Sequence, residues 1–85
     1  MSTAIVTGGT SGIGLAAAKL FLAENFNCVL VGRSGVRFKK IRAELSGSYR
    51  FISGDVSKVA DCEKIIQRTV ELFGGVDDTV NGGRF

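Results

Sequence analysis

The chain has 85 residues, of which 45% are hydrophobic and 22% charged, and its formal net charge is +3 at pH 7. This composition is typical of a globular protein and excludes an intrinsically disordered one, while the length allows one small domain or part of a larger one. The mild positive charge is spread along the chain without interleaved aromatic residues, which argues against a nucleic-acid-binding surface.

The two cysteines, Cys28 and Cys62, lie far apart in the sequence, and the chain has no histidine. We therefore expect neither a zinc site nor a disulfide framework, and we interpret both thiols as buried small apolar groups in a reducing compartment. The N-terminus has no basic region and no long apolar stretch. This indicates no signal peptide and no membrane span, so a cytoplasmic location is expected.

A first β-strand is predicted at the short apolar run Ala4-Ile5-Val6, and a helix follows it after a glycine-rich stretch. The helix should bury one apolar stripe against a sheet, because apolar residues recur there at helical spacing. The residues of this expected stripe are Ile13, Ala16, Ala17, Leu20 and Phe21.

The connecting stretch reads Thr7-Gly8-Gly9-Thr10-Ser11-Gly12-Ile13-Gly14. Without a Cβ, Gly8 and Gly12 permit a sharp turn and a close approach of the main chain to a ligand, and Gly14 lets the helix lie tight against the strand. The helix N-terminus would direct free N–H groups into the loop, which suits a diphosphate. A tight connection without a ligand would use the same glycines, so the loop alone leaves both interpretations open.

The second strand is predicted at residues 28–31, a continuous apolar run that suits a parallel strand covered on both faces. A second amphipathic helix should extend to about Ser46, with Phe38, Ile41 and Leu45 on its buried side. Gly47-Ser48 should end this helix, and Tyr49 to Ser53 should form a third strand.

A third helix is expected after this strand, with Ser57 as its N-cap and Gly74-Gly75 at its end. The residues expected to form its buried stripe are Val59, Cys62, Ile66, Thr69, Val70 and Phe73. A fourth strand is predicted from Val76 to Asn81, although Asp78 and Thr79 make it less apolar than a buried central strand.

The predicted element order is β-α-β-α-β-α-β, an α/β fold with a Rossmann-like parallel sheet, right-handed crossovers and strand order 3-2-1-4. The first two helices would cover one face and the third helix the other. One helix does not cover a whole face, and the outer edge of the fourth strand would be open. This pattern indicates the truncated half of a doubly wound fold, or burial of that surface in a homo-oligomer.

The spacing G-x-x-x-G-x-G, preceded by Thr7, resembles the T-G-x-x-x-G-x-G signature of the short-chain dehydrogenase/reductase family. The pair Asp55-Val56, just after the third strand, matches the family's acidic-apolar pair. That resemblance implies that the carboxylate accepts a hydrogen bond from the adenine amino group and that the backbone N–H serves a ring nitrogen. From the residues alone, Asp55 could equally be a turn or cap residue.

The end of the second strand offers Gly32 and Arg33 where nucleotide-binding α/β units that prefer NAD carry an acidic residue. A guanidinium pairs with a 2′-phosphate through two parallel hydrogen bonds, so we predict NADP in preference to NAD. Ser34, Thr10 or Ser11 could donate further hydrogen bonds. The alternative is a solvated surface arginine at the mouth of a turn.

The tail from Val80 to Phe85 resembles, imperfectly, the family's N-N-A-G stretch after the fourth strand: Asn81 aligns with its first asparagine and Gly82 replaces the second. The residues expected to bind the cofactor are Gly8, Thr10, Ser11, Gly12, Ile13, Gly14, Arg33, Ser34, Asp55, Val56 and Asn81.

No catalytic residue is predicted. The resemblance implies a serine and a Y-x-x-x-K motif located after the fourth strand, whereas the only tyrosine, Tyr49, is followed four residues later by Ser53. We therefore interpret the chain as the NADP(H)-binding portion of an oxidoreductase, inactive by itself. A non-catalytic dinucleotide-binding or assembly module is the alternative, and a purely structural role would leave the glycine loop without a ligand.

Overall fold

The computed structural model describes residues 2–8, 12–33 and 35–75, and for residues 78–81 it describes the backbone. The four strands are β1 (Thr3–Thr7), β2 (Asn27–Gly32), β3 (Tyr49–Ser53) and β4 (Asp78–Asn81). The helices are α1 (Gly12–Ala23), α2 (Gly35–Ile41) and α3 (Val59–Phe73), and a short 3₁₀ helix, η1 (Arg42–Glu44), follows α2. The predicted elements are present in the predicted order, but the second helix is shorter than expected because its last turn tightens into η1.

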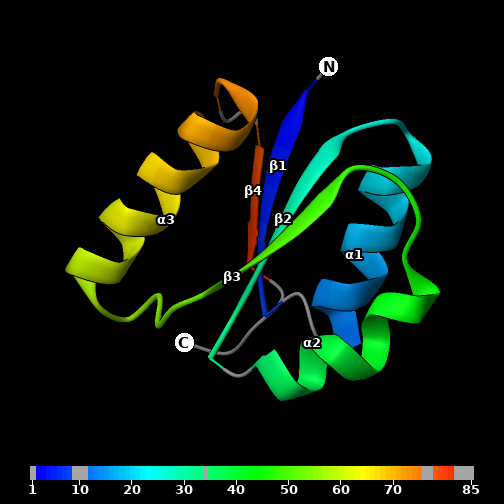
Figure 1. Ribbon diagram of the computed structural model, residues 1–85, viewed down its shortest axis with the longest axis horizontal. Coiled ribbons are helices and arrows are strands. Elements are labelled where there is room, and N and C mark those ends of the chain that lie inside the picture. The colour runs from blue at the N-terminus through cyan, green and yellow to red at the C-terminus, as the bar shows by residue number, and fades with distance from the viewer. Residues whose placement is uncertain (1, 9–11, 34, 76–77, 82–85) are drawn as a thin grey trace.

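All strand pairs in the sheet are parallel, and the strand order is β3-β2-β1-β4. Val6 in the central strand β1 lies opposite Leu30 of β2 and Val80 of β4. Helices α1 and α2 lie on one side of the sheet and α3 lies on the other (Figure 1). This is the predicted Rossmann-like arrangement, in which parallel strands are joined by crossover helices.

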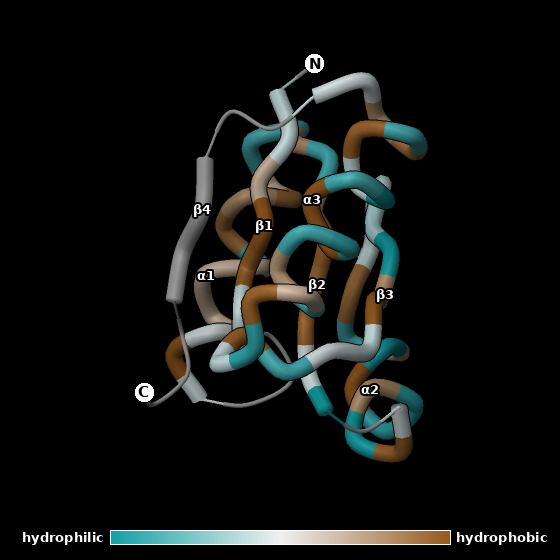
Figure 2. Tube along the Cα trace, turned by 90° about the vertical axis from the view of Figure 1, so that its left-hand side faces the viewer, coloured by the Kyte–Doolittle hydropathy of each residue, from teal (hydrophilic) through white to brown (hydrophobic). Residues whose placement is uncertain are grey.

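The core has two layers, one on each face of the sheet, because successive side chains of a strand point to opposite faces. Apolar residues run along the central strands β1 and β2 (Figure 2), and every side chain of β1 is buried. The layer under α1 and η1 consists of Val6, Ala18, Leu22, Cys28, Leu30 and Leu45. The layer under α3 consists of Ile5, Val29, Val31 and Ile65, with Ile52, Val56 and Phe73 packed around it.

Helix α1 contacts the sheet through a stripe that matches the prediction only in part: Ala17 and Phe21 pack against the core, whereas Ala16 is exposed. Gly14, Ala18 and Leu22 are its buried residues, whereas Ile13 and Leu20 are 75% and 70% exposed. Since α1 is apolar on almost every side, hydrophobic spacing does not select a face. Gly14 has no side chain and Ala18 has only a methyl group, so the face that carries them can pack closely against the strands.

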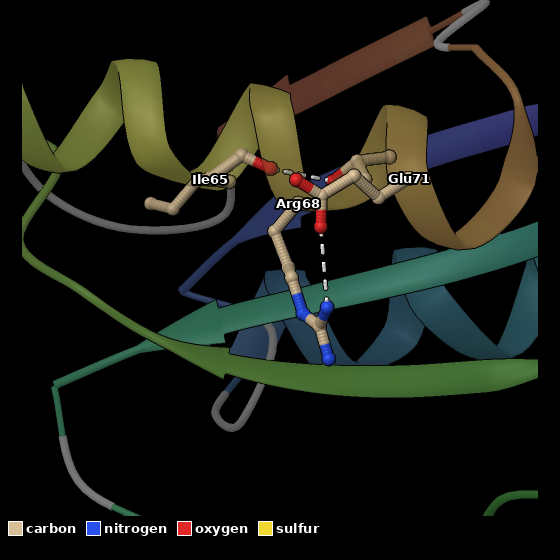
Figure 3. A network of polar contacts seen from close by, with 4 residues as sticks. Ile65, Arg68 and Glu71 are labelled. Atoms are coloured by element: carbon tan, nitrogen blue, oxygen red, sulfur yellow. Dashed lines mark hydrogen bonds and ion pairs between the residues drawn. The ribbon is translucent and has the colours of Figure 1, made fainter.

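Helix α3 also departs from its predicted stripe. Ile65 and Thr69 are buried, whereas Val59, Ile66 and Val70 are 74%, 53% and 45% exposed, so the prediction is wrong for these three. The buried Thr69 hydroxyl donates a 2.8 Å hydrogen bond to the carbonyl of Ile65, which allows a polar residue in the core. An ion pair of 3.3 Å between Arg68 and Glu71 lies on the exposed side (Figure 3).

The prediction for the start of α3 is wrong, and the prediction for its end is confirmed. Ser57 is not the N-cap; Lys58 holds that position and makes no side-chain capping bond. At the other end, Gly74 adopts φ 85° and donates its N–H to the carbonyl of Val70, so the helix ends where predicted. No helix in the described ranges is long and apolar enough to cross a membrane.

Candidate functional site

The carboxyl ends of β1, β2 and β3 are joined to one another by main-chain hydrogen bonds that continue past the sheet. The N–H of Gly8, just after β1, donates to the carbonyl of Val31 in β2 at 2.9 Å. The N–H of Gly54, just after β3, donates to the carbonyl of Gly32 at the end of β2, also at 2.9 Å. The connections after β1, β2 and β3, which contain predicted site residues, therefore start from one hydrogen-bonded edge of the sheet.

The glycine-rich connection leaves β1 through a backbone conformation that favours glycine. Gly8 has φ 65° and Gly12, the first residue of α1, has φ 49°. Both values lie in the left-handed region, where a Cβ is strained. Gly14 is buried, and Ile13 exposes its side chain beside the loop. Thr10 and Ser11 lie outside the described residues.

Arg33 directly follows the last residue of β2 and has an exposed side chain. Its carbonyl accepts a 3.4 Å hydrogen bond from the hydroxyl of Ser53, the last residue of β3. This long contact links the main chain of Arg33 to β3, and the guanidinium makes no hydrogen bond or ion pair with any residue that the structure describes. Ser34, predicted as an additional donor, lies outside the described residues.

The Asp55 carboxylate is oriented by the residue two positions later. Its Oδ1 accepts hydrogen bonds from the Ser57 hydroxyl at 2.6 Å and from the Ser57 N–H at 3.0 Å. These two bonds, followed by the positive charges of Arg33 and Lys58, outweigh slight desolvation and lower the pKa of Asp55 below its ordinary value of 3.8. Asp55 is therefore an ionised acceptor at neutral pH. Its turn role and a ligand-binding role are compatible, because both bonds from Ser57 reach the same oxygen.

Two residues near the start of α3 contact this segment in a way that sequence reasoning missed. Oδ2 of Asp61 accepts a 2.8 Å hydrogen bond from the N–H of Asp55, and Sγ of Cys62 donates to the carbonyl of Val56 at 3.1 Å. Cys62 is thus half-buried and hydrogen-bonded, not simply a small apolar group. The only sequence signal for this role of Asp61 was its place in the first turn of a helix. An acidic residue there is normally attributed to a favourable interaction with the helix dipole.

The last predicted site residue, Asn81, ends β4 and is paired in register with Thr7 of β1. Its backbone therefore reaches the same edge of the sheet, whereas its side chain lies outside what the structure describes.

A separate hollow of about 230 Å³ near the opposite end of α1 contains none of the predicted site residues; it is lined by Lys19, Leu22, Ala23, Glu44, Leu45 and Ser46. Among the described residues, no three His, Cys, Asp or Glu side chains form a group that could hold a metal ion.

Comparison with known proteins identifies the class to which this fold and edge belong. The sequence matches the short chain dehydrogenase family over residues 2–83, so the chain belongs to that family. Members of this family bind a nicotinamide dinucleotide, and the chain corresponds to their dinucleotide-binding region. The resemblance predicted from the glycine spacing is therefore confirmed.

An NADP-dependent (R)-specific alcohol dehydrogenase of Lentilactobacillus kefiri is 41% identical over 80 residues, which cover 92% of this chain and 32% of that protein. A short chain dehydrogenase structure from Bacillus anthracis gives a TM-score of 0.88 at 29% identity, covering 96% of this chain and 34% of that one. The alcohol dehydrogenase of Thermococcus sibiricus complexed with 5-hydroxy-NADP gives 0.83 at 32% identity, covering 93% and 35%. The chain thus spans about a third of the length of the relatives it matches.

Proposed function

We propose that residues 1–85 act as an NADP(H)-binding domain of a short-chain dehydrogenase and prefer NADP(H) to NAD(H). The main support for this proposal is the carboxyl edge of the sheet, where main-chain hydrogen bonds link the connections after β1, β2 and β3. Along that edge lie a glycine turn, an exposed guanidinium and an ionised carboxylate. Ligands of open α/β sheets bind outside the carboxyl ends of the strands, where these groups stand.

The diphosphate would lie at the start of α1. Gly8 and Gly12, both at positive φ, carry no side chain that would keep a ligand away from the main chain. The 12-residue α1 presents the positive end of its dipole there, with no acidic residue in its first turn to oppose an anion. Thr10 and Ser11 would add hydroxyl donors from the loop.

Arg33 would pair with the 2′-phosphate of the adenosine ribose, with Ser34 as a further donor. Gly32 stands where an acidic residue would repel that phosphate, and the side chain of Arg33 is exposed while its main-chain carbonyl accepts from Ser53. Two relatives support this choice by name: one is described as NADP-dependent and the other is complexed with 5-hydroxy-NADP.

The adenine ring would lie against Asp55 and Val56. Oδ2 of Asp55 has no hydrogen-bond donor among the described residues, so it can accept from the adenine amino group while Oδ1 remains with Ser57. The N–H of Val56 would serve the neighbouring ring nitrogen. Such a two-point contact distinguishes adenine from bases with another edge pattern.

The nicotinamide ring, when bound, is the group that gives or accepts a hydride. Asn81, at the end of β4, would approach the cofactor from the strand next to the glycine turn. The chain has a single tyrosine, Tyr49, and it is not part of a Y-x-x-x-K sequence. We therefore propose that these residues bind the dinucleotide and do not transfer protons to a substrate.

Titration of the chain with NADPH and with NADH tests this function. Arg33→Ala should weaken NADPH binding by about 10- to 100-fold, because hydrogen bonds to a charged partner contribute roughly 1.5–3 kcal/mol, and should change NADH binding by less than about twofold. Arg37→Ala, on the exposed side of α2, is the matched control and should change neither affinity. Equal losses for both ligands would refute the phosphate role, and the absence of saturable binding would refute the function.

An assembly role is a second candidate, favoured by the exposed apolar side chains of Val59, Ile66 and Val70 on α3. These residues would pair with another copy of the chain or with further polypeptide on the same face of the sheet. Light scattering tests the first case: the molar mass should exceed 9.0 kDa and return to it in Ile66→Asp. A monomer at all concentrations would contradict pairing of copies.

A further inference from the structure

The segment that connects β3 to α3 is held against the helix from two sides. Asp61 accepts the N–H of Asp55 at 2.8 Å, and the Cys62 thiol donates to the carbonyl of Val56 at 3.1 Å. Both residues lie near the N-terminus of α3, and both contacts reach backbone atoms. The main chain of Asp55 and Val56 therefore cannot rotate without breaking a hydrogen bond to α3.

The connection between β3 and α3 also packs closely against α3. A Cβ built on Gly54 would meet Cδ1 of Ile65 at 2.9 Å and Cβ of Asp61 at 3.8 Å. Ile65 is only 4% exposed and belongs to the core layer beneath α3. The residue that follows β3 thus lies so close to α3 that a Cβ there would require the Ile65 side chain to shift, and Asp61 is part of the surface it meets.

The contacts of Asp55 divide into two groups with different consequences. Ser57 orients the carboxylate, whereas Asp61 holds the backbone from which that carboxylate projects. The peptide unit that carries the Val56 N–H lies between the two anchored points. Both groups proposed to contact adenine are consequently fixed relative to α3 before any ligand arrives, and such preorganisation strengthens binding by lowering the ordering cost.

We propose that Asp61 is a positioning residue for adenine recognition: its carboxylate holds the Asp55–Val56 backbone so that the Asp55 carboxylate and the Val56 N–H together match the edge of adenine. This inference rests on the proposed NADP(H)-binding function. The competing explanation is that Asp61 only stabilises the N-terminal turn of α3 through the helix dipole. Only the positioning role predicts that replacing Asp61 changes the preference for adenine over another base.

The test compares NADP with nicotinamide hypoxanthine dinucleotide phosphate in titrations of the full 85-residue chain. Hypoxanthine carries a carbonyl and a ring N–H in place of the amino group and ring nitrogen of adenine, so it mismatches both Asp55 and Val56. Asp61→Ala should reduce the preference for NADP over this analogue by about three- to tenfold, the equivalent of one hydrogen bond. The preference for NADPH over NADH, which depends on Arg33, should stay unchanged.

Two further variants provide the controls. Asp61→Asn keeps an oxygen that can accept the Asp55 N–H, so it should retain most of the adenine preference although it removes the charge near the helix N-terminus. Glu63→Ala removes an exposed acid from the next part of the same helix and should leave both preferences unchanged. If Asp61→Asn lost as much as Asp61→Ala, a dipole effect would replace the positioning role.

A measurement without ligand reports the hydrogen bond directly. In NMR spectra of the free chain at neutral pH, the Asp55 amide proton should exchange slowly with solvent because it is donated to Asp61. This protection should be lost in Asp61→Ala and kept in Asp61→Asn. No saturable binding of NADP by the unsubstituted chain would overturn the proposed function and this proposal together, even with the amide signature present. Normal NADP binding with an unchanged adenine preference in Asp61→Ala would overturn the positioning role alone.

Discussion

The Ser57 hydroxyl donates a 2.6 Å hydrogen bond to the Asp55 carboxylate, and this contact replaces the helix cap that the sequence led us to expect of Ser57. The serine hydroxyl and N–H both serve one carboxylate oxygen. As a result α3 begins without a side-chain cap, while the acceptor proposed for adenine is held ionised and oriented. Ser57 therefore orients the Asp55 carboxylate of the proposed site and does not stabilise the start of α3 as a side-chain cap.

Replacing Ser57 should raise the pKa of Asp55. The largest cause of its lowered pKa is the hydroxyl bond, so in Ser57→Ala the value should move back toward 3.8, with the backbone N–H, Arg33 and Lys58 still holding it down. Ser57→Thr, which keeps a hydroxyl, should leave it low. NMR titration of the Asp55 carboxyl carbon checks this, and an unchanged value in Ser57→Ala would contradict the assigned cause.

The same shift predicts a pH dependence of stability. Because the pKa of Asp55 is lower in the folded chain than in the unfolded one, its contribution is fully present above the ordinary value of 3.8 and is lost as the pH falls through the folded value. Ser57→Ala should therefore be less stable than the parent at about pH 6, and the difference should shrink at about pH 2. Urea unfolding at both pH values measures this. A difference that stays constant would show that the effect does not come from ionisation.

The buried thiol of Cys28 should affect stability in alkali. Burial raises its pKa from 9.0 to about 11, so the contribution is fully present below pH 9.0 and is lost as the pH rises through the folded value. Unfolding experiments should show a loss of about 2–3 kcal/mol across that interval, the size of a shift of two pKa units, and Cys28→Ala should remove this slope.

Thiol labelling distinguishes the two cysteines. Cys28 is fully buried, whereas Cys62 is half-buried near the start of α3. In the native chain an alkylating reagent should modify Cys62 well before Cys28, and both should react at similar rates in urea. Fast native-state labelling of Cys28 would contradict its burial in the layer under α1.

The order of elements could be predicted because the two central strands have clear signals. The apolar runs around Val6 and Leu30 are short and bounded by polar or glycine residues, and a parallel sheet with right-handed crossovers follows from their alternation with helices. The positions of Gly8, Arg33 and Asp55 at successive strand ends were likewise readable, since parallel strands bring these ends to one edge. The hydrogen bonds that join those ends are main-chain contacts and leave no trace in residue types.

The helix faces could not be predicted reliably, for a different physical reason in each helix. In α1 nearly every residue is apolar, so hydrophobicity does not single out a face, and the small residues Gly14 and Ala18 are buried. In α3 the buried Thr69 satisfies its hydroxyl within the helix, so a polar residue occupies the core while Ile66 faces outward. Asp61 was missed because its partner, the N–H of Asp55, is a backbone group.

The glycine that ends α3 should be specifically required. Gly74 has φ 85° and caps the helix through its N–H, so Gly74→Ala should destabilise the chain by about 1–2 kcal/mol, the cost of placing an L-residue in the left-handed region. Gly75→Ala is the control: Gly75 lacks a positive φ and has open space around it, so the change should stay within about 0.5 kcal/mol. Equal losses measured by urea unfolding would argue against the capping role.

The contact between Gly54 and Ile65 should couple the tip of β3 to the core. Gly54→Ala places a Cβ at 2.9 Å from Cδ1 of Ile65 and should cost about 1–3 kcal/mol, since Ile65 is buried and has little room to move. Ile65→Val removes that Cδ1 and should cost about 0.5–1.5 kcal/mol by itself. In the double variant the clash is absent, so the loss should fall short of the sum by about 1 kcal/mol or more.

Binding provides a second readout of this coupling, because Gly54 immediately precedes Asp55. Gly54→Ala should displace the segment held by Asp61 and weaken NADP binding more than binding of the hypoxanthine analogue, and adding Ile65→Val should restore the difference. Additive free energies of unfolding would show that the two side chains relax independently. A restored stability without a restored adenine preference would place the rigidity of the segment in its hydrogen bonds and not in the packing of β3 against α3.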